Sequence, residues 1–315
     1  MRILANDGID PLGKQLLEDA GFTVDTVHIP QDELATKLPD YDGITVRSAT
    51  KVRKELIDSC PNLKLIGRGG VGMDNIDVDY ARSKGITVVN TPAASSLSVA
   101  ELVFAHLLGG VRFLYDAQRK MPVEGDTNFG TLKKAYAKGV ELRGKTLGII
   151  GFGRIGRETA KVGLGLGMDV IVTDLFEAPA TLAVELSGGI SVDVPVKQVE
   201  ITELLKQADF ISLHVPFTDK PVIGKTEFEL LKPGVGLVNA SRGGVIDEQA
   251  LIEALDSGKV AFAGLDVYEN EPTPRRELLI HPKVSLTPHI GAATGEAQER
   301  IGEELAQLII EHLKK

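Results

Sequence analysis

The stretch TLGIIGFGRIG, residues 146–156, decides the fold. Apolar residues typical of a buried strand over 146–151 run directly into the pattern G-x-G-x-x-G, and residues 157–166 can continue as a helix. A second predicted strand, 169–174, ends on Asp174, which lies 18 residues past Gly156. This order of strand, glycine turn, helix and acid-terminated strand favours a dinucleotide-binding βαβ unit over an ordinary glycine turn.

Each residue of this motif has a physical task. Gly151 permits the tight turn, Gly153 lets the backbone approach a pyrophosphate, and Gly156 allows the helix to pack closely on the strand. The first N–H groups of the helix are free to bind phosphate. Asp174 would accept hydrogen bonds from the ribose hydroxyls and would repel a 2′-phosphate, and no arginine follows it to compensate. NAD is therefore predicted rather than NADP.

The pattern of strand followed by helix extends in both directions along the chain. Further strands are predicted at residues 2–5, 23–27, 43–47, 63–67, 86–90, 209–215, 235–240, 260–266 and 284–287. Helices are predicted at 11–20, 52–59, 97–118 and 294–315, and residues 121–140 are expected to form an irregular, exposed connection. Such alternation predicts an α/β protein with parallel sheets covered by helices on both faces.

Composition limits the class of protein. A chain of 315 residues is long enough for two domains. A net charge of −9 and a pI near 5.3 leave no broad basic face for nucleic acid. The single cysteine, Cys60, excludes a cysteine-rich zinc module, and no metal site is expected. Because we find no signal peptide and no apolar run of membrane-spanning length, we expect a cytoplasmic protein without a membrane partner.

Three polar segments follow predicted strands in the second half of the chain. They contain Arg242 on a glycine-rich turn, Glu271 in a cluster of acids, and His289. Taken singly, these residues are more often a surface arginine, a turn and a loop histidine. Because the carboxyl ends of parallel strands meet at one sheet edge, we expect them to act together. A guanidinium binds a carboxylate, and a histidine paired with an acid can take a hydroxyl proton, so the set suits oxidation of a hydroxy acid.

Several motifs in order carry a family resemblance. They are VRSAT (46–50), GRGGVGMDN (67–75), NTP (90–92), the glycine loop and the three polar segments. With them the chain resembles the D-isomer-specific 2-hydroxyacid dehydrogenases over nearly its whole length, and most of all the phosphoglycerate dehydrogenases. The resemblance implies a discontinuous, flavodoxin-like substrate-binding domain at 1–95 and 288–315. A Rossmann NAD-binding domain at 96–287 would be inserted into it, and both domains would be doubly wound.

The resemblance also implies residue roles. Arg242 would orient the substrate carboxylate and keto oxygen, and His289, paired with Glu271, would be the general acid and base. The N–H groups of Gly70, Val71 and Gly72 would also meet the substrate carboxylate. The implied cofactor contacts are Val71, Gly151, Gly153, Arg154, Ile155, Gly156, Asp174, Val215, Pro216, Ala240, Ser241, Arg242, Asp266, His289, Gly291 and Ala292.

Substrate choice depends on two arginines of the first domain. Arg47 and Arg68 follow or end predicted strands, where they would bind a distal phosphate; alternatively they pair with Asp74 and Asp77. The predicted function is NAD-dependent oxidation of 3-phospho-D-glycerate to 3-phosphooxypyruvate, the first step toward serine. It would be carried out by a homodimer joined through the helix near 97–111, without the serine-binding regulatory domain of some relatives.

Two alternatives stay open. The first is the same chemistry on another small anionic 2-hydroxy or 2-keto acid, as in a glyoxylate or hydroxypyruvate reductase. The second is an NAD-sensing binding protein like the C-terminal-binding co-repressors, which share the scaffold without depending on turnover.

Overall fold

The computed structural model describes residues 1–314 and divides the chain into two compact units. Unit 1 comprises Met1–Ser98 and the segment from Ala292 to the C-terminus, and unit 2 comprises Val99–Gly291. The boundaries lie at Ser98 and Ala292 rather than at the expected 95 and 288. The reason is local. The Ser98 hydroxyl bonds to that of Thr294 within unit 1, whereas the N–H groups of residues 289–291 bind Asp266 of unit 2.

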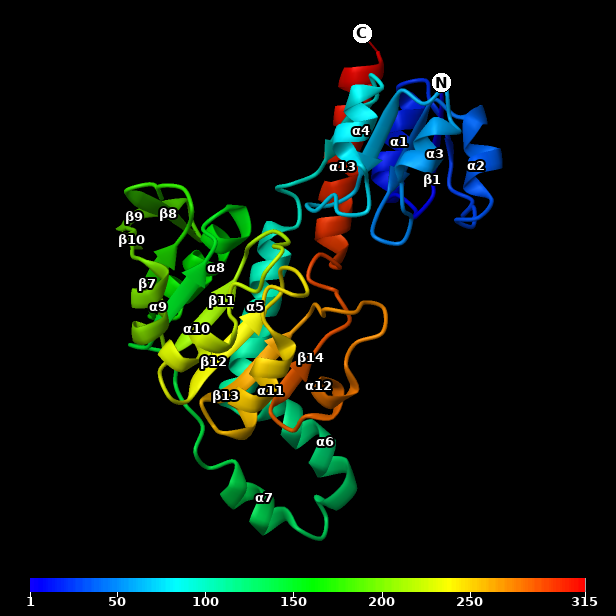
Figure 1. The fold of residues 1–315 in the computed structure, drawn as a ribbon. Coiled ribbons are helices and arrows are strands. Elements are labelled where there is room, and N and C mark those ends of the chain that lie inside the picture. The colour runs from blue at the N-terminus through cyan, green and yellow to red at the C-terminus, as the bar shows by residue number, and fades with distance from the viewer. Residues whose placement is uncertain (315) are drawn as a thin grey trace. The chain divides into compact units, whose positions relative to one another are not determined.

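Unit 1 contains one parallel sheet with helices on both faces. In spatial order its strands are β2 (Thr23–Asp25), β1 (Arg2–Ala5), β3 (Gly43–Val46), β4 (Leu65–Arg68) and β5 (Thr87–Asn90). Its helices are α1 (Pro11–Asp19), α2 (Leu34–Lys37), η1 (Leu38–Asp40), α3 (Lys54–Asp58), α4 (Val78–Ser83) and α13 (Gly295–Leu313). Figure 1 shows α13 running alongside this unit's sheet. Along β1, Ile3 and Ala5 pack with α1 and α13, whereas Leu4 packs with α2, α3 and α4. This is the doubly wound, flavodoxin-like order.

Unit 2 contains a larger parallel sheet. In spatial order its strands are β10 (Lys197–Gln198), β7 (Asp169–Thr173), β6 (Thr146–Ile150), β11 (Phe210–Leu213), β12 (Val235–Asn239), β13 (Val260–Leu265) and β14 (Val284–Leu286). One face packs against α5 (Ser96–Val111) and α8 (Arg154–Gly165). The other face packs against α9 (Ile201–Gln207), α10 (Lys225–Leu230), α11 (Glu248–Asp256) and α12 (Arg276–Ile280). The order reverses at β6, as in a Rossmann domain, so the carboxyl edge beside β6 and β11 is the ligand-binding edge of this fold.

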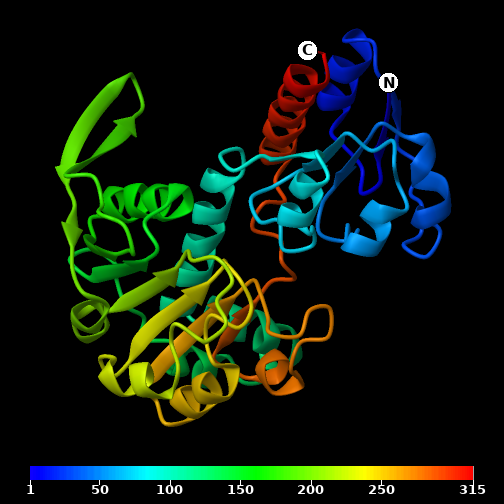
Figure 2. The same ribbon diagram turned by 45° about the horizontal axis from the view of Figure 1, so that its top comes forward.

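All eleven predicted strands are present, with ends that differ by at most two residues. An antiparallel hairpin of β8 (Thr181–Leu186) and β9 (Ile190–Pro195), which was not predicted, stands out from the large sheet in Figure 2. A signal was present: apolar and polar residues alternate on either side of Ser187-Gly188-Gly189, a pattern typical of a hairpin.

The predicted long helix at 97–118 is wrong. Two helices, α5 and α6 (Leu114–Glu124), meet at a bend of 58°, because Phe113 between them has a left-handed φ of 56°. The expected irregular connection at 121–140 is also wrong in part, since α6 continues to Glu124 and α7 (Phe129–Ala135) follows. The Phe113 ring stacks on the Tyr136 ring with the ring centroids 5.8 Å apart, and this contact accompanies the bend between α5 and α6. Within residues 1–314, no single helix has the length and hydropathy of a membrane span; only the bent pair α5–α6 meets those limits when its halves are joined.

Candidate active site

The glycine loop of unit 2 has two positions where a side chain cannot fit. Gly151 has a φ of +92°, and a Cβ there would lie 2.4 Å from the His214 carbonyl oxygen. At Gly156 a Cβ would lie 2.2 Å from the carbonyl oxygen of Gly151, because α8 passes directly over the turn. These contacts are the tight turn and the close helix–strand packing that the motif requires.

The surroundings of this loop fit a dinucleotide. A Cβ at Gly153 would meet no protein atom within 4 Å, and Gly153 is the N-cap of α8, so open space lies at the helix N-terminus where a pyrophosphate binds. At the end of β7, the Asp174 carboxylate accepts hydrogen bonds from the N–H groups of Phe152 (2.5 Å) and Phe176 (3.0 Å). The acid therefore lies beside the loop, and each oxygen keeps a lone pair for a ribose hydroxyl.

The other predicted cofactor contacts of unit 2 gather at the carboxyl edge of its sheet. Apart from the catalytic residues described below, they are Arg154 and Ile155 at the start of α8, Val215 and Pro216 after β11, Ala240 and Ser241 after β12, Asp266 after β13, and Gly291 at the end of the unit. Two of the predicted contacts, Val71 and Ala292, belong to unit 1.

The predicted acid–base pair is formed. His289 Nδ1 lies 2.8 Å from Glu271 Oε2, and Glu271 Oε1 accepts a hydrogen bond from the N–H of Tyr268 at 3.0 Å. Partial burial acts to raise the pKa of Glu271, but the hydrogen bond to His289, that from Tyr268 and the positive charge of Arg242 outweigh it and hold the pKa below its usual value. Glu271 is therefore a carboxylate at neutral pH and serves as the acceptor for His289.

Arg242 is brought to this pair by the turn after β12. Asn239 Nδ2 donates to the Arg242 carbonyl oxygen at 2.9 Å, and Arg242 Nη1 donates to the Ser241 carbonyl oxygen at 2.7 Å. The turn presses against the acidic segment so closely that a Cβ at Gly243 would lie 1.9 Å from the Tyr268 carbonyl oxygen. The three predicted catalytic residues thus share one site although they come from three different loops.

A cavity of about 380 Å³ adjoins the acid–base pair. His289 and Glu271 form part of its wall, and the remaining lining is largely apolar: Tyr268, Pro272, Pro274, Leu279, Leu286, Thr287 and Pro288. Within residues 1–314, no three His, Cys, Asp or Glu side chains are arranged to hold a metal ion.

Arg47 of unit 1 follows β3 on a loop held by Asp7. The Asp7 carboxylate accepts hydrogen bonds from the N–H groups of Arg47 (2.7 Å) and Thr50 (3.0 Å) and from the Thr50 hydroxyl (2.6 Å). The guanidinium of Arg47 makes no hydrogen bond or ion pair within residues 1–314 and lines a cavity of about 270 Å³. Asp77, the alternative partner, instead pairs with Arg53 at 2.9 Å.

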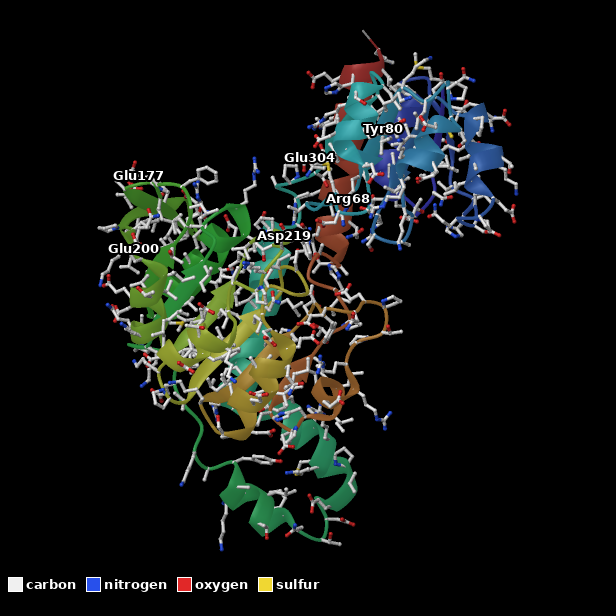
Figure 3. All side chains as sticks on the ribbon, in the orientation of Figure 1. Arg68, Tyr80, Glu177, Glu200, Asp219 and Glu304 are labelled. Carbon is white, nitrogen blue, oxygen red and sulfur yellow. The ribbon has the colours of Figure 1, made fainter. Side chains whose placement is uncertain are left out.

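Arg68, labelled in Figure 3, ends β4, and its side chain folds back over the loop that follows it. Its Nη1 donates to the Gly69 carbonyl oxygen at 3.1 Å, and a Cβ at Gly70, whose φ is +140°, would lie 1.5 Å from that nitrogen. The Gly70 N–H donates to the Arg68 carbonyl oxygen, while Asn90 Nδ2 donates to the Val71 carbonyl oxygen. Of the three N–H groups expected to meet a carboxylate, only those of Val71 and Gly72 are left without a protein acceptor within residues 1–314.

Comparison with known proteins agrees with this geometry. Residues 104–291 match the family pattern described as D-isomer specific 2-hydroxyacid dehydrogenase, NAD binding domain. The chain is 45% identical over 318 residues to a hydroxypyruvate reductase from Thermotoga maritima, covering 99% of this chain and 98% of that protein. It is 42% identical over 314 residues to a D-3-phosphoglycerate dehydrogenase from Methanocaldococcus jannaschii, covering 98% of this chain but 57% of that protein.

A solved structure agrees with the fold. The structure of a glyoxylate reductase from Paecilomyes thermophila matches with a TM-score of 0.83 at 32% identity, over 99% of this chain and 95% of that one. The matched pattern covers more than half of the chain and carries the NAD-binding glycine loop. The chain belongs to the D-isomer-specific 2-hydroxyacid dehydrogenases, an NAD-dependent oxidoreductase family.

Proposed function

We propose that the protein interconverts 3-phospho-D-glycerate and 3-phosphooxypyruvate with NAD. The observation that carries the reaction type is the His289–Glu271 pair at 2.8 Å beside Arg242. Because a carboxylate only accepts hydrogen bonds, Nδ1 of His289 must carry its proton toward Glu271. In the neutral ring Nε2 then holds a free lone pair, which suits it to take the hydroxyl proton of the substrate.

Three residues of unit 2 have different roles in the proposed reaction. His289 removes the hydroxyl proton during oxidation and returns it during reduction, and Glu271 stabilises the charged ring between those events. The Arg242 guanidinium stabilises negative charge on the keto oxygen and carboxylate of the acid. NAD, when bound at the glycine loop, supplies the hydride acceptor.

The proposed substrate follows from Arg47. Its guanidinium has no protein partner within residues 1–314 and faces a cavity, so it is available to an anionic group of the substrate. A phosphate is such a group, and it would offer the guanidinium two oxygens at once. The second candidate is hydroxypyruvate, which lacks the phosphate; the 45% identity to the Thermotoga maritima enzyme over nearly its full length favours it.

Initial rates of NADH consumption test this choice. We expect 3-phosphooxypyruvate to be preferred over hydroxypyruvate, glyoxylate and pyruvate, and NADH over NADPH. Arg47→Gln should raise KM for the phosphorylated acid by roughly 10–100-fold, the size of a lost charge-assisted hydrogen bond. The same variant should change KM for hydroxypyruvate by less than about threefold. Arg53→Gln is the matched control, because Arg53 lies in the same unit but is paired with Asp77.

Other outcomes separate the alternatives. If the wild-type protein turns over hydroxypyruvate as well as or better than the phosphorylated acid, hydroxypyruvate becomes the assigned substrate. The assigned chemistry stays the same. Tight NADH binding without turnover of any of the four acids would favour the NAD-sensing binding protein.

A further inference from the structure

A buried histidine on α5 contacts the segment that leads into the loop of His289. His106 is 3% exposed, and its ring nitrogens contact two hydroxyls: Nδ1 lies 2.8 Å from Ser285 Oγ, and Nε2 lies 3.0 Å from Thr287 Oγ1. The fold makes room for this ring at Gly264 of β13, where a Cβ would lie 2.5 Å from the His106 Cβ. Neither His106 nor Thr287 belongs to the set of residues expected to touch cofactor or substrate.

The Asp266 carboxylate sets the direction of the hydrogen bonds that lead from it to His106. Thr287 Oγ1 lies 2.7 Å from Asp266 Oδ1, and a carboxylate only accepts, so the Thr287 hydroxyl donates to Asp266. The Thr287 oxygen must then accept the N–H of His106 Nε2, and Nδ1 of the neutral ring accepts from Ser285. Burial lowers the pKa of His106 more than the charge of Asp266 raises it, in agreement with a neutral ring.

Asp266 holds the backbone of the loop that carries His289. Its Oδ1 and Oδ2 accept the N–H groups of Ile290 and Gly291, each at 2.8 Å, and its carbonyl oxygen accepts the N–H of His289 at 2.8 Å. Three consecutive N–H groups therefore converge on one residue. His289 itself has a left-handed φ of 55°, a strained backbone that persists only where its surroundings fix it.

We propose that His106 is a positioning residue for the general base, acting through the Thr287 hydroxyl and the Asp266 carboxylate to hold the 287–291 loop. This inference rests on the function proposed for His289. His106 does not meet the reacting atoms. It turns the Thr287 hydroxyl toward Asp266, which fixes the orientation of the carboxylate that binds the loop. A displacement of about 1 Å in a reacting group can lower turnover by ~100-fold. A loop that is held less firmly should therefore lower kcat.

Two pairs of variants test the proposal. Thr287→Val keeps the shape of the side chain and removes its hydroxyl, whereas Thr287→Ser keeps the hydroxyl. His106→Leu removes the donor to Thr287, whereas His106→Gln retains an N–H donor near the place of Nε2. We expect Thr287→Val and His106→Leu to lower kcat by ~10–100-fold. The loss should be larger in kcat than in KM for the keto acid or Kd for NADH, and Thr287→Ser and His106→Gln should retain most of the wild-type kcat.

Amide hydrogen exchange gives a readout that needs no turnover. The N–H groups of Ile290 and Gly291 should exchange faster in Thr287→Val than in the wild-type protein and Thr287→Ser. The proposal is overturned if Thr287→Val keeps both wild-type kcat and slow exchange, or if Thr287→Ser loses as much kcat as Thr287→Val. A folded His106→Leu that keeps wild-type kcat likewise overturns it. If His106→Leu does not fold, loss of kcat in His106→Gln or wild-type kcat in Thr287→Val still overturns the proposal. If the wild-type protein turns over no 2-keto acid, the proposed function fails while exchange still tests the hydrogen-bond chain.

Discussion

Gly151 and Gly153 stand two residues apart in one loop, yet the space around them differs. A Cβ at Gly151 would collide with the His214 carbonyl oxygen, and its φ of +92° disfavours any L side chain, whereas a Cβ at Gly153 would meet no protein atom. Gly151→Ala should therefore lower the free energy of unfolding by ~1–3 kcal/mol. Gly153→Ala should leave stability unchanged and weaken NADH binding by roughly tenfold, about 1.4 kcal/mol. Urea unfolding and fluorescence titration with NADH measure the two effects. If Gly153→Ala binds NADH as tightly as the wild-type protein, the pyrophosphate does not bind at this loop.

His106 predicts a pH dependence of stability. Its folded-state pKa lies below the ordinary value of about 6.5, so the unfolded chain binds more protons there than the folded one as pH falls below 6.5. The contribution of His106 to stability is therefore complete above pH ~6.5 and is lost as pH falls toward the lowered pKa. Relative to His106→Gln, which does not titrate, the wild-type protein should lose up to ~1.4 kcal/mol per pH unit in that range. Urea unfolding between pH 5 and 8 compares the two slopes, and parallel slopes would contradict the expectation.

At the scale of the element, α1 and α13 pack through glycine. A Cβ at Gly13 would lie 2.5 Å from the carbonyl oxygen of Gly302, so the two backbones touch at this crossing. Gly13→Ala should force the helices apart and lower the free energy of unfolding by ~1–3 kcal/mol. Gly165→Ala, at an exposed position of α8 with open space around it, is the control and should stabilise by up to ~1 kcal/mol through helix propensity. Thermal unfolding distinguishes the two, and equal effects would argue against a close crossing.

The helices and strands show which elements can be predicted from neighbouring residues alone. Strands of both units were predicted because their apolar runs end at glycine, proline or polar turns, and these signals lie within a few residues. The break at Phe113 was missed because nothing in its neighbours demands a left-handed φ; the ring contact with Tyr136, 23 residues away, accompanies it. A glycine inside α1 likewise indicates only a weaker helix until its contact with Gly302 is known.

At the scale of the whole molecule, the homodimer expected from the sequence stays a prediction. Exposed apolar side chains gather on α5, α6 and α7 of unit 2, and α6 and α7 extend beyond the sheet of that unit (Figure 1). They are Leu108, Leu114, Met121, Val123 and Phe129. Such a set on a helical extension is typical of a subunit interface. Sedimentation should give about twice the 33.7 kDa of the chain.

A double variant tests where that interface lies. Leu114→Glu with Phe129→Asp should yield a monomer, because charges buried at an apolar interface are strongly disfavoured. Val27→Glu, at an exposed position of unit 1, should leave the mass unchanged. A monomeric wild-type protein would contradict the predicted dimer. A double variant that is still dimeric would show that the interface lies elsewhere.

The sequence by itself determined the α/β class, the glycine loop with its acid, and the three polar segments that contain Arg242, Glu271 and His289. These follow from short-range spacing and from the rule that parallel strands end at one edge. The return of the C-terminal segment to the first domain was implied by the family resemblance, and the structure places it from Ala292. Only the tertiary structure decided that Arg68 folds over Gly70 and that Asp266 holds the loop of His289. His106 and Thr287 are 181 residues apart, and no local pattern links them. Contacts of that kind depend on which faces the packed core brings together, and packing is settled by the whole chain at once.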